Sequence, residues 1–414
     1  MARSAAIALG VSVVLVLTGC SVPRPLPTPT PSASSSVGAT GDGVLRIGTL
    51  FSMSGDVAST GAGMVAAVEV AVRDVNAAGG VLGQPVEAFY RDAGSADGAS
   101  LESAFADLVS RGIDVVMGPS DSALAERLLP LAADAGVVVM APATPISAST
   151  DSVFSLMASA DQQAAAIVGA IADEGGESVA IITTGDALGL SFERAARAAL
   201  ESRGVRLAGV EQLDAATNPA RLAFSVAGGE PDAIILASSA SLSAQHPAII
   251  TALANRGVRG DQLWMTAPVL ADYSSTVAPG LLEGARGVRE GAPTTDELLA
   301  RLRQSDPALV SAPFASETYD AVILVALAAE LAGDDSGFSV ARFVREAASE
   351  GIACSSFGEC LDVLATEPQI QYQGLSGPVT FTDQSGVADG ALSLYQYLAD
   401  NRAELVGPLV PIGP

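Results

Sequence analysis

The sequence has no lysine, one histidine and one tryptophan among its 414 residues, and aromatic residues make up only 4% of it. Without lysine there can be no GxxxxGK(S/T) phosphate loop, and a single histidine excludes an HExxH zinc site. The GxSxG motif of serine hydrolases is also absent. These absences favour a protein that is not an enzyme and that requires neither a metal nor a cofactor.

Two weaker patterns do not change this interpretation. His246 lies in the polar run SAQHP, which is typical of a surface loop at the start of a helix. Gly61 and Gly63 have the GxG form of a nucleotide-binding turn, but Gly61 follows the end of the nearest predicted strand, Phe51, by ten positions. A dinucleotide fingerprint follows its strand directly, so none is assigned here.

Positive charge is also scarce. Acidic residues outnumber basic ones by 46 to 21, and the formal net charge is −25. Such a surface repels phosphate backbones and anionic headgroups. We therefore expect no nucleic-acid partner.

The start of the chain is typical of a bacterial lipoprotein signal. Arg3 supplies a positive charge, residues 5–17 form an apolar stretch, and residues 17–20 (LTGC) match the lipobox. The stretch is shorter than the roughly 20 apolar residues that span a bilayer, and no basic stop-transfer cluster follows it. We predict a signal peptide over residues 1–19 and lipidation of Cys20, rather than a transmembrane anchor.

Residues 20–43 are rich in proline, serine and threonine and contain almost no large apolar side chain. Such a segment cannot bury enough surface to fold, and proline keeps it extended at about 3 Å per residue. We predict a tether that holds a folded body on the extracytoplasmic face of the cell membrane.

Cys354 and Cys360 are the two cysteines that remain after Cys20. An even pair in an exported protein favours a disulfide. The alternatives are weaker, because no CxxC redox motif is present and one histidine leaves too few ligands for a zinc site. The closed loop is short, so chain entropy gives this disulfide about 2 kcal/mol.

Some 370 residues follow the tether, more than one compact core usually holds, so two lobes are expected. Short β-rich runs alternate with amphipathic stretches in two series, and each series implies a parallel sheet with helices on both faces. The first series predicts strands at 44–51, 85–92, 113–118 and 137–142 and helices at 63–78, 97–110 and 122–135. The second predicts strands at 178–184, 205–213, 232–238 and 262–268 and helices at 191–202, 219–227 and 245–256.

The last part of the chain changes character. Residues 316–331 have a helical pattern, and their apolar part contains Glu330 and follows Asp320, so we interpret it as a buried helix rather than a membrane span. Residues 377–386 and 391–398 are β-rich and lie around a turn at 383–386.

The predicted architecture favours a particular kind of ligand site. At the carboxyl ends of parallel strands, the following helix starts point backbone N–H groups into a crevice. Two such lobes face to face would form a cleft lined by donors. This geometry favours a small ligand with a carboxylate or a similar polar group.

Three segments carry a resemblance to a known family: RIGTLFSMSGDVASTGAG (46–63), AVRDVNAAGGVLGQPVE (71–87) and MGPSDSALAERLLPLAADAGVVVMAPAT (117–144). Later markers are Tyr319-Asp320-Ala321, the loop between the last two cysteines, and GLSGPVTFTDQSG. Together with the lipobox they resemble the substrate-binding lipoproteins of branched-chain amino acid ABC transporters. The resemblance covers residues 44 to about 398.

The resemblance implies a type I periplasmic-binding fold: an α/β protein with two doubly wound parallel-sheet lobes and a hinge of three crossovers. We place the crossovers near residues 158–161, 287–291 and 372–378. Lobe 1 would then comprise residues 44–158 and 289–372, and lobe 2 would comprise residues 159–288 and 373–405. The two lobes would close on a ligand as a hinged trap.

The resemblance also implies ligand-binding residues. The family's carboxylate-binding serine lies at a helix start about twenty positions before the proline at the next strand end, and counting back from Pro142 gives Ser122. Ala143 and Thr144 match a second polar contact. The other positions assigned to the pocket are Ser120, Thr60, Leu188 and Ser239. The alternative is that Ser122 only caps its helix, with Ser120 and Asp121 as turn residues.

The resemblance is weaker at the position that binds a ligand ammonium. Amino-acid binders of the family place an acid there, whereas this sequence has Pro268. A buried ammonium needs a charge or several acceptors. An amino-acid ligand would therefore require Asp186 or Asp272 to turn inward, and we expect Asp272 to face solvent.

These observations predict an extracytoplasmic solute-binding lipoprotein of an ABC importer. We expect a monomer that captures a small polar solute, an amino acid or a related compound, and delivers it to a permease in the membrane. Two alternatives remain: a sensor lipoprotein that signals to a membrane receptor, and a structural envelope lipoprotein that binds no ligand.

Overall fold

The computed structural model describes residues 41–54, 58–95, 98–146, 150–382, 386–388 and 390–406. The predicted signal peptide, Cys20 and residues 20–40 of the predicted tether lie outside these residues. Within the described chain, no helix is both long enough and apolar enough to cross a membrane.

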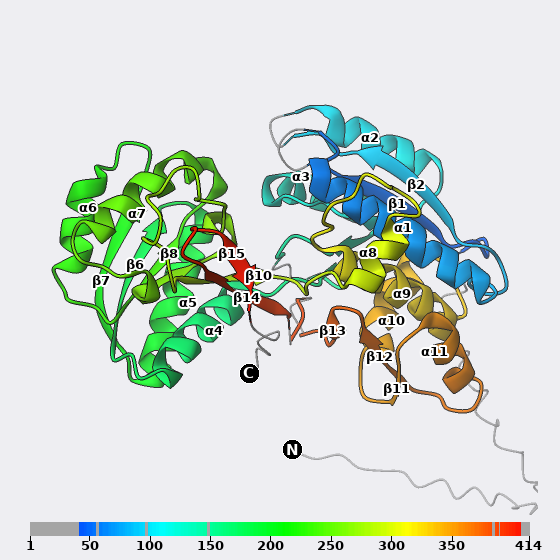
Figure 1. Cartoon of the computed structure of the whole chain (residues 1–414). Helices are drawn as coiled ribbons and strands as arrows, with labels where there is room; N and C mark the ends of the chain where they lie inside the picture. The colour runs from blue at the N-terminus through cyan, green and yellow to red at the C-terminus, as the bar shows by residue number, and fades with distance from the viewer. Residues whose placement is uncertain are drawn as a thin grey trace, which may run out of the picture. The chain divides into compact units, whose positions relative to one another are not determined.

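The first lobe is built on a parallel sheet with the strand order β2-β1-β3-β4-β5 (Figure 1). Side chains alternate between its faces: Val115 and Met117 join the core under α1, α9 and α10, whereas Val116 joins the core under α2 and α3. The strands are β1 (Arg46–Phe51), β2 (Glu87–Asp92), β3 (Val115–Met117), β4 (Val138–Ala141) and β5 (Val153–Ser155). The helices are α1 (Ala58–Ala77), α2 (Ser100–Ser110), α3 (Ser122–Ala135), α8 (Asp296–Leu302), α9 (Ala315–Ala332), α10 (Gly337–Ala347) and α11 (Phe357–Leu364).

The second lobe contains a sheet with the order β15-β14-β10-β9-β8-β6-β7, in which β14 runs antiparallel to both of its neighbours. Val179 and Ile181 of β6 face the core under α4 and α5, and Ala180 and Ile182 face the core under α6 and α7. The strands are β6 (Ser178–Thr184), β7 (Arg206–Leu213), β8 (Ala233–Ala237), β9 (Leu263–Met265), β10 (Arg286–Glu290), β14 (Leu392–Tyr397) and β15 (Ala403–Leu405). The helices are α4 (Ala160–Asp173), α5 (Ala187–Arg203), α6 (Pro219–Ala227) and α7 (His246–Ala254).

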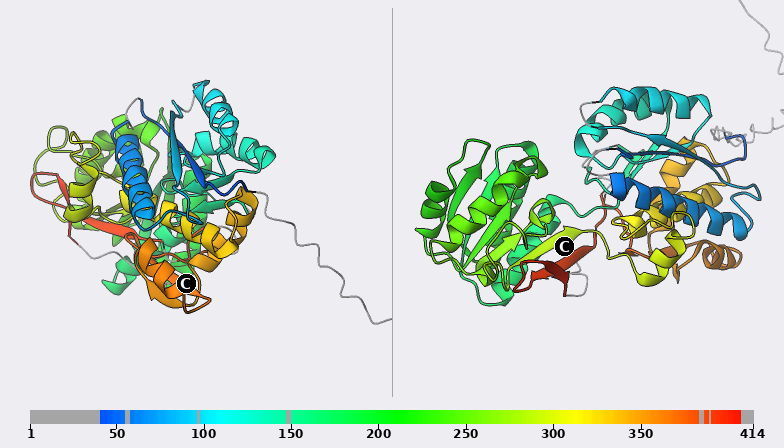
Figure 2. Two further views of the ribbon diagram at one scale, coloured as in Figure 1. Left: turned by 90° about the vertical axis from the view of Figure 1, so that its right-hand side faces the viewer. Right: turned by 45° about the horizontal axis from the view of Figure 1, so that its top comes forward.

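The predicted fold class is confirmed. Each strand and helix of the two predicted series has a counterpart, and each sheet is covered by helices on both faces (Figure 2). The main differences lie at helix starts: α1 begins at Ala58 instead of Gly63, and α5 begins at Ala187 instead of Ser191. The earlier start of α5 follows from Asp186, whose side chain caps the helix by accepting the Gly189 N–H.

Helix α9 is the buried helix that the sequence predicted. Every residue from Ala315 to Ala329 is buried, because α1 and α10 pack along it and β12 (Ile370–Gly374) crosses it. Strand β12 forms a small sheet with β11 (Ile352–Cys354) and β13 (Gly377–Pro378) that adds to the same core.

The carboxyl-terminal part corrects the predicted third crossover. Val379 and Val387 belong to the core of the first lobe, and Phe381 packs edge-on against Phe154 with ring centroids 5.3 Å apart. These apolar side chains keep the chain with the first lobe as far as residue 388. The third crossover therefore lies just before β14, later than the predicted residues 372–378, and residues 373–388 do not belong to the second lobe.

The three crossovers contact one another. Gly390, in the third crossover, packs closely against Ala158, in the first crossover. If residue 390 had a Cβ, that atom would lie 2.7 Å from the Ala158 Cα. The N–H of Gly291, in the second, donates to the carbonyl of Ala391, in the third, at 2.9 Å. These close backbone contacts form the hinge.

Residues 41–43 are part of the first lobe rather than of the tether. The Gly41 N–H donates to Asp334 Oδ1 (2.9 Å), and the Gly43 N–H donates to Asp335 Oδ1 (2.8 Å). A Cβ on Gly41 would lie 2.1 Å from Asp335 Oδ1, so only glycine fits there. Residues 41–43, which were assigned to the tether, therefore belong to the folded body.

The buried carboxylate of Asp320 connects α9 to the loop after β12. It accepts hydrogen bonds from the Tyr372 hydroxyl (2.8 Å), the Leu375 N–H (2.8 Å), the Ser376 N–H (2.7 Å) and the Ser376 hydroxyl (2.5 Å). A Cβ on Gly374 would lie 2.3 Å from Asp320 Oδ2, so glycine is required beside it. Burial raises the pKa of Asp320, and the four donated hydrogen bonds oppose that rise.

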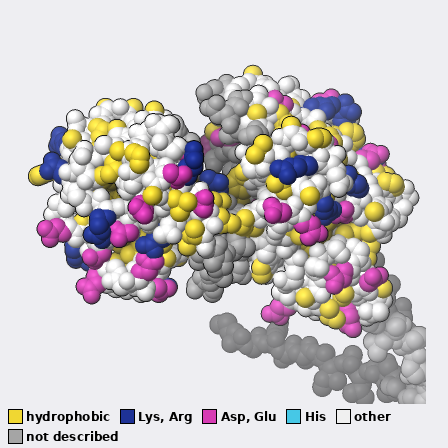
Figure 3. All heavy atoms as spheres, viewed as in Figure 1, with side chains coloured by type: hydrophobic (Ala, Val, Ile, Leu, Met, Phe, Trp, Pro, Cys, Tyr) yellow, Lys and Arg dark blue, Asp and Glu magenta, His cyan; other side chains and the backbone are white. Residues whose placement is uncertain are grey.

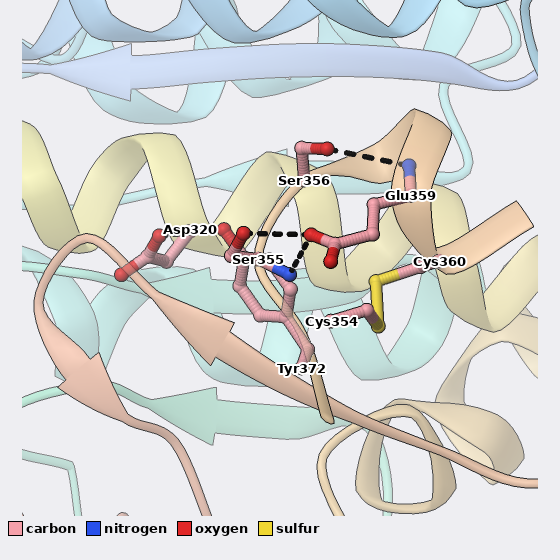
Figure 4. Close-up of a disulfide and its surroundings, with 7 residues drawn as sticks. All are labelled: Asp320, Cys354, Ser355, Ser356, Glu359, Cys360 and Tyr372. Carbon is pink, nitrogen blue, oxygen red and sulfur yellow. Dashed lines mark hydrogen bonds between the residues drawn. A yellow bond between two sulfur atoms is a disulfide. The ribbon is translucent and has the colours of Figure 1, made fainter. Parts of the chain in front are cut away.

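Cys354 and Cys360 form a disulfide that closes the turn between β11 and α11 (Figure 4). Both cysteines are buried. The N–H and hydroxyl of Ser355 donate to Glu359 Oε2 at 2.8 and 2.7 Å within the same turn (Figure 4). The structure thus forms the pairing that the sequence predicted.

Asp320→Asn is expected to lower the free energy of unfolding by about 2–4 kcal/mol, because an amide cannot accept all four hydrogen bonds and leaves buried donors unpaired. Urea unfolding followed by circular dichroism measures the change. Asp272→Asn is the matched control and should have little effect, since Asp272 forms an exposed ion pair with Arg402. Equal effects of the two substitutions would contradict the role given to Asp320.

The disulfide is expected in the exported protein, so mass spectrometry of alkylated, unreduced protein should find neither Cys354 nor Cys360 modified. Reduction should destabilise the protein by only about 2 kcal/mol, because the closed loop is short. Free thiols at both positions in exported protein would show that the bond does not form.

Candidate functional site

The carboxyl ends of β1, β3, β4 and β5 lie along one edge of the first sheet, because these strands are parallel. Hydrogen bonds connect the loops that follow them. The Ser52 N–H donates to Ser120 Oγ at 3.4 Å, and Thr144 Oγ1 donates to the Pro119 carbonyl at 2.7 Å. The Ser155 hydroxyl donates to the Thr144 carbonyl at 2.9 Å. The network brings Ser120 and Thr144 to the same edge.

Ser122 is the first residue of α3 and does not cap that helix. The cap is Asp121, whose Oδ1 accepts from the Ala123 N–H (2.8 Å) and the Leu124 N–H (3.1 Å). The alternative that Ser122 is the N-cap is therefore wrong. Ser122 is half-buried, and neither its hydroxyl nor its N–H has a hydrogen-bond partner among the residues that the structure describes. Both donors remain available at a helix start, where an anion is favoured.

Thr144 and Ala143 differ in their access to a ligand. Thr144 is buried, and its hydroxyl is engaged by the Pro119 carbonyl, so this hydroxyl braces the loop. Ala143 is half-buried and is the more accessible of the two. A ligand at this position would meet the backbone of residues 143–144 and the Ala143 methyl group rather than the threonine hydroxyl.

Thr60 reaches the same edge because α1 starts unusually close to the end of β1. A Cβ on Gly61 would lie 2.2 Å from the Ser52 carbonyl oxygen, so glycine at this position permits the approach. Thr60, immediately before it, is half-buried. Since Ser52 also bonds Ser120, Thr60 and Ser120 flank the same strand end.

Leu188 and Ser239 lie at the corresponding edge of the second sheet. Leu188, near the start of α5 after β6, is 57% exposed. Ser239 follows β8, and its hydroxyl lies 2.7 Å from that of Ser241. Pro268 follows β9 and is exposed. No hydrogen bond joins this set to the first-lobe set within the described part of the chain, so the predicted residues form two groups, one at each sheet edge.

The two acids considered for a ligand ammonium are both engaged. Asp186 Oδ1 accepts from the Gly189 N–H (2.8 Å) and the Thr184 hydroxyl (2.9 Å). Asp272 is exposed and pairs with Arg402 at 3.2 Å, which confirms that it faces solvent. Both carboxylates therefore already have partners within the protein.

His246 is not the surface residue that its polar sequence context predicted. It is 1% exposed, and its Nε2 lies 2.9 Å from the Ser238 hydroxyl, because the start of α7 packs its side chain against the loop after β8. Burial lowers the pKa of His246. Among the described residues, no three His, Cys, Asp or Glu side chains are grouped to hold a metal ion.

Glu317 is a residue that the sequence reasoning missed. It lies on α9, is 1% exposed, and accepts the Ala292 N–H on Oε1 at 2.5 Å. Its Oε2 is buried and has no partner among the described residues. Burial raises the pKa of Glu317 to about 7, and the nearby Asp320 adds to the rise. The available signal was an acidic residue in the first turn of a helix whose middle turns are apolar.

The contact between Glu317 and Ala292 fastens the second crossover to the first lobe. Gly291 precedes Ala292 with φ of +89°, and a Cβ there would lie 3.1 Å from Glu317 Oε1. The crossover thus takes a backbone conformation that favours glycine, next to a buried carboxyl group.

Two α/β lobes with polar groups at the carboxyl edges of their sheets, joined by three crossovers, define a two-lobed binding protein rather than an enzyme. The sequence matches the Periplasmic binding protein family over residues 44–402, and the chain belongs to this family. The resemblance proposed from the sequence is confirmed.

Several solved structures are similar to this chain. A putative branched-chain amino acid ABC transporter protein from Rhodospirillum rubrum has a TM-score of 0.66 and 19% identity over 88% of this chain and 100% of its own. A substrate-binding protein from Desulfitobacterium hafniense, in complex with Leu, also has a TM-score of 0.66 and 19% identity over 88% of this chain and 100% of its own. A solute-binding protein from Rhodopseudomonas palustris, in complex with p-hydroxybenzoic acid, has a TM-score of 0.65 and 17% identity over 90% of this chain and 98% of its own. These similarities show the fold.

A search of curated protein sequences returns no significant match.

Glu317→Gln is expected to change how stability depends on pH. The pKa of Glu317 rises from 4.5 to about 7 in the folded state, so the folded chain keeps its proton where the unfolded chain has lost it. Stability therefore falls as the pH rises through this window. A pKa rise of this size corresponds to a loss of about 3 kcal/mol in the free energy of unfolding once the pH is above the folded-state pKa. Relative to the unmodified protein, Glu317→Gln should gain stability between about pH 5 and pH 8, measured by urea unfolding.

Glu346→Gln, on the exposed face of α10, is the matched control and should not change the pH dependence. Burial also raises the pKa of Asp114 to about 7, so a weaker decline should persist in Glu317→Gln, whereas Glu346→Gln should keep the full decline. If the curves of Glu317→Gln and the unmodified protein run parallel, Glu317 does not titrate in this range.

Proposed function

We propose that this chain is an extracytoplasmic solute-binding lipoprotein of an ABC importer, which captures a small polar ligand between its two lobes and delivers it to a permease. The observation that carries the proposal is Ser122, whose hydroxyl and N–H lack partners among the described residues at the start of α3. Ser120, Thr60 and Ala143 border the same sheet edge.

A carboxylate suits this edge because it can accept both donors of Ser122. The start of α3 adds the positive end of the helix dipole, and hydrogen bonds to a charged acceptor are about twice as strong as neutral ones. The opposite sheet edge contributes Leu188, whose exposed side chain can cover an apolar part of the ligand, and the hydroxyl of Ser239. The ligand would thus have its anionic end on the first lobe.

An amino acid or a related carboxylate fits this arrangement. The similar proteins from Desulfitobacterium hafniense and Rhodopseudomonas palustris were solved with Leu and with p-hydroxybenzoic acid, and these two molecules share a carboxylate. Only Leu carries an ammonium group. Because Asp186 and Asp272 are engaged elsewhere, the described residues favour a carboxylate without an ammonium.

The proposal includes a membrane anchor and an ABC permease partner. The lipobox at Cys20 supplies a lipid anchor, and the proline-rich segment that follows holds the folded body near the membrane. The protein acts as a monomer. The lobes close around the solute and dock on the permease.

Ser122→Ala is expected to weaken solute binding by about 1–3 kcal/mol, because it removes one charge-assisted hydrogen bond. Isothermal titration calorimetry with the identified solute measures the loss. Ser103→Ala, on the exposed face of α2, is the matched control and should bind normally. Unchanged affinity in Ser122→Ala would remove this residue from the site.

The solute itself can be found by mass spectrometry of molecules retained after purification, together with a thermal-shift screen of small metabolites. Loss of uptake of that solute on deletion of the gene supports transport. Loss of a ligand-dependent response without loss of uptake supports the sensor alternative. If no metabolite stabilises the protein, the proposal of a solute-binding function is wrong.

A further inference from the structure

A pocket of about 240 Å³ lies where the second crossover meets the ends of β10 and β14. Its walls include Arg289, Glu290, residues 291–294, residues 310–314 and Tyr395, and we call it the hinge pocket. The volume equals that of roughly eight liquid water molecules, which leaves room for a small organic acid. None of the predicted ligand-site residues lines it.

Arg289 is the charged group of this pocket that lacks a counter-ion. It is half-buried and takes part in no ion pair or hydrogen bond among the described residues. Its guanidinium instead lies over the ring of Tyr395, 5.0 Å from the centroid. Arginines elsewhere, such as Arg46 and Arg127, are paired with carboxylates, and acidic and basic side chains are interspersed over the surface in view (Figure 3).

Glu290, which follows Arg289 on β10, also lines the pocket. The two charges attract each other, but the side chains form no ion pair, because successive strand residues point to opposite faces. Glu290 Oε1 accepts instead from Gln163 Nε2 at 2.5 Å, on α4. The planar fork of a guanidinium stacked on an aromatic ring keeps its N–H groups directed outward, where they match the two oxygens of a carboxylate.

The walls of the hinge pocket are held in place by the surrounding backbone. The Ser393 hydroxyl donates to the Gly291 carbonyl at 2.7 Å, and the Thr294 hydroxyl donates to the Ala312 carbonyl. Phe314 has φ of +61°, a conformation that non-glycine residues rarely adopt. Strained backbone of this kind clusters at ligand sites, where it preorganises the binding surface.

The hinge pocket adjoins the first-lobe sheet edge through α1. A Cβ on Gly63 would lie 3.0 Å from Ala312, which lines the pocket. Thr60 lies one turn earlier on the same helix, at the edge that carries Ser120. Helix α1 therefore contacts a residue that lines the pocket and also reaches the sheet edge.

We propose that the hinge pocket is an anion subsite in which Arg289 binds a carboxylate of a small molecule. The net charge of −25 disfavours anions at long range, so an unpaired guanidinium is the local group that can hold one. The carboxylate belongs either to the captured solute, as its second acidic group, or to a separate small acid that occupies the hinge. The first case rests on the proposed function, and the second stands without it.

Calorimetry with benzoate, which has one carboxylate, and succinate, which has two, tests the proposal on the purified protein. Arg289→Gln should weaken binding by about tenfold or more, as expected for a lost bidentate charged contact. Arg289→Lys keeps the charge without the fork and should bind with intermediate affinity. Arg221→Gln, at an exposed position, is the control, and unchanged thermal unfolding shows that each variant is folded.

The outcomes separate the two sources. If Arg289→Gln and Ser122→Ala both weaken succinate binding, the pocket holds a second carboxylate of the captured solute. If only Arg289→Gln weakens binding, the pocket holds a separate acid. If Arg289→Gln binds both probes normally, or if the unmodified protein binds neither at millimolar concentration, the inference is wrong. A solute that depends on Ser122 and not on Arg289 would overturn this inference while leaving the proposed function in place.

Discussion

The hydrogen bond between the Ala292 N–H and the buried carboxyl group of Glu317 is the contact on which the arrangement of the hinge depends. It fastens the second crossover to α9, the most deeply buried helix of the first lobe. The neighbouring Gly291 then bonds Ala391 in the third crossover, which packs through Gly390 against Ala158 in the first. These few backbone positions therefore connect the three crossovers to the core of the first lobe.

The use of charge follows a consistent pattern. Buried acids hold backbone: Asp320 organises the loop after β12, Asp334 and Asp335 bind residues 41–43, and Glu317 binds the second crossover. Exposed acids cap helices or pair with arginine. As a result, the first sheet edge has the unpaired donors of Ser122, and the guanidinium of Arg289 lies beside the second crossover without an ion pair. In the function proposed above, an anionic ligand would be recognised by such donors and not by overall charge.

Part of the candidate site followed from sequence order alone. Ser120 and Ser122 were placed correctly at a strand end and a helix start, because strand and helix periodicity locates the ends of elements and the carboxyl ends of parallel strands share one edge. The roles of individual groups did not follow. The Thr144 hydroxyl braces a loop, Asp121 rather than Ser122 caps α3, and His246 is buried, since each of these outcomes depends on a partner distant in sequence or on local backbone direction.

The sequence by itself determined the two βαβ series, the buried character of α9 and the pairing of Cys354 with Cys360, because these features depend on local periodicity or on a short loop. Only the tertiary structure decided where the third crossover lies, that residues 41–43 belong to the fold, that Glu317 binds the second crossover, and that Arg289 lies over Tyr395. These features depend on side chains that find apolar or polar partners up to several hundred residues away, and local patterns contain no information about such partners.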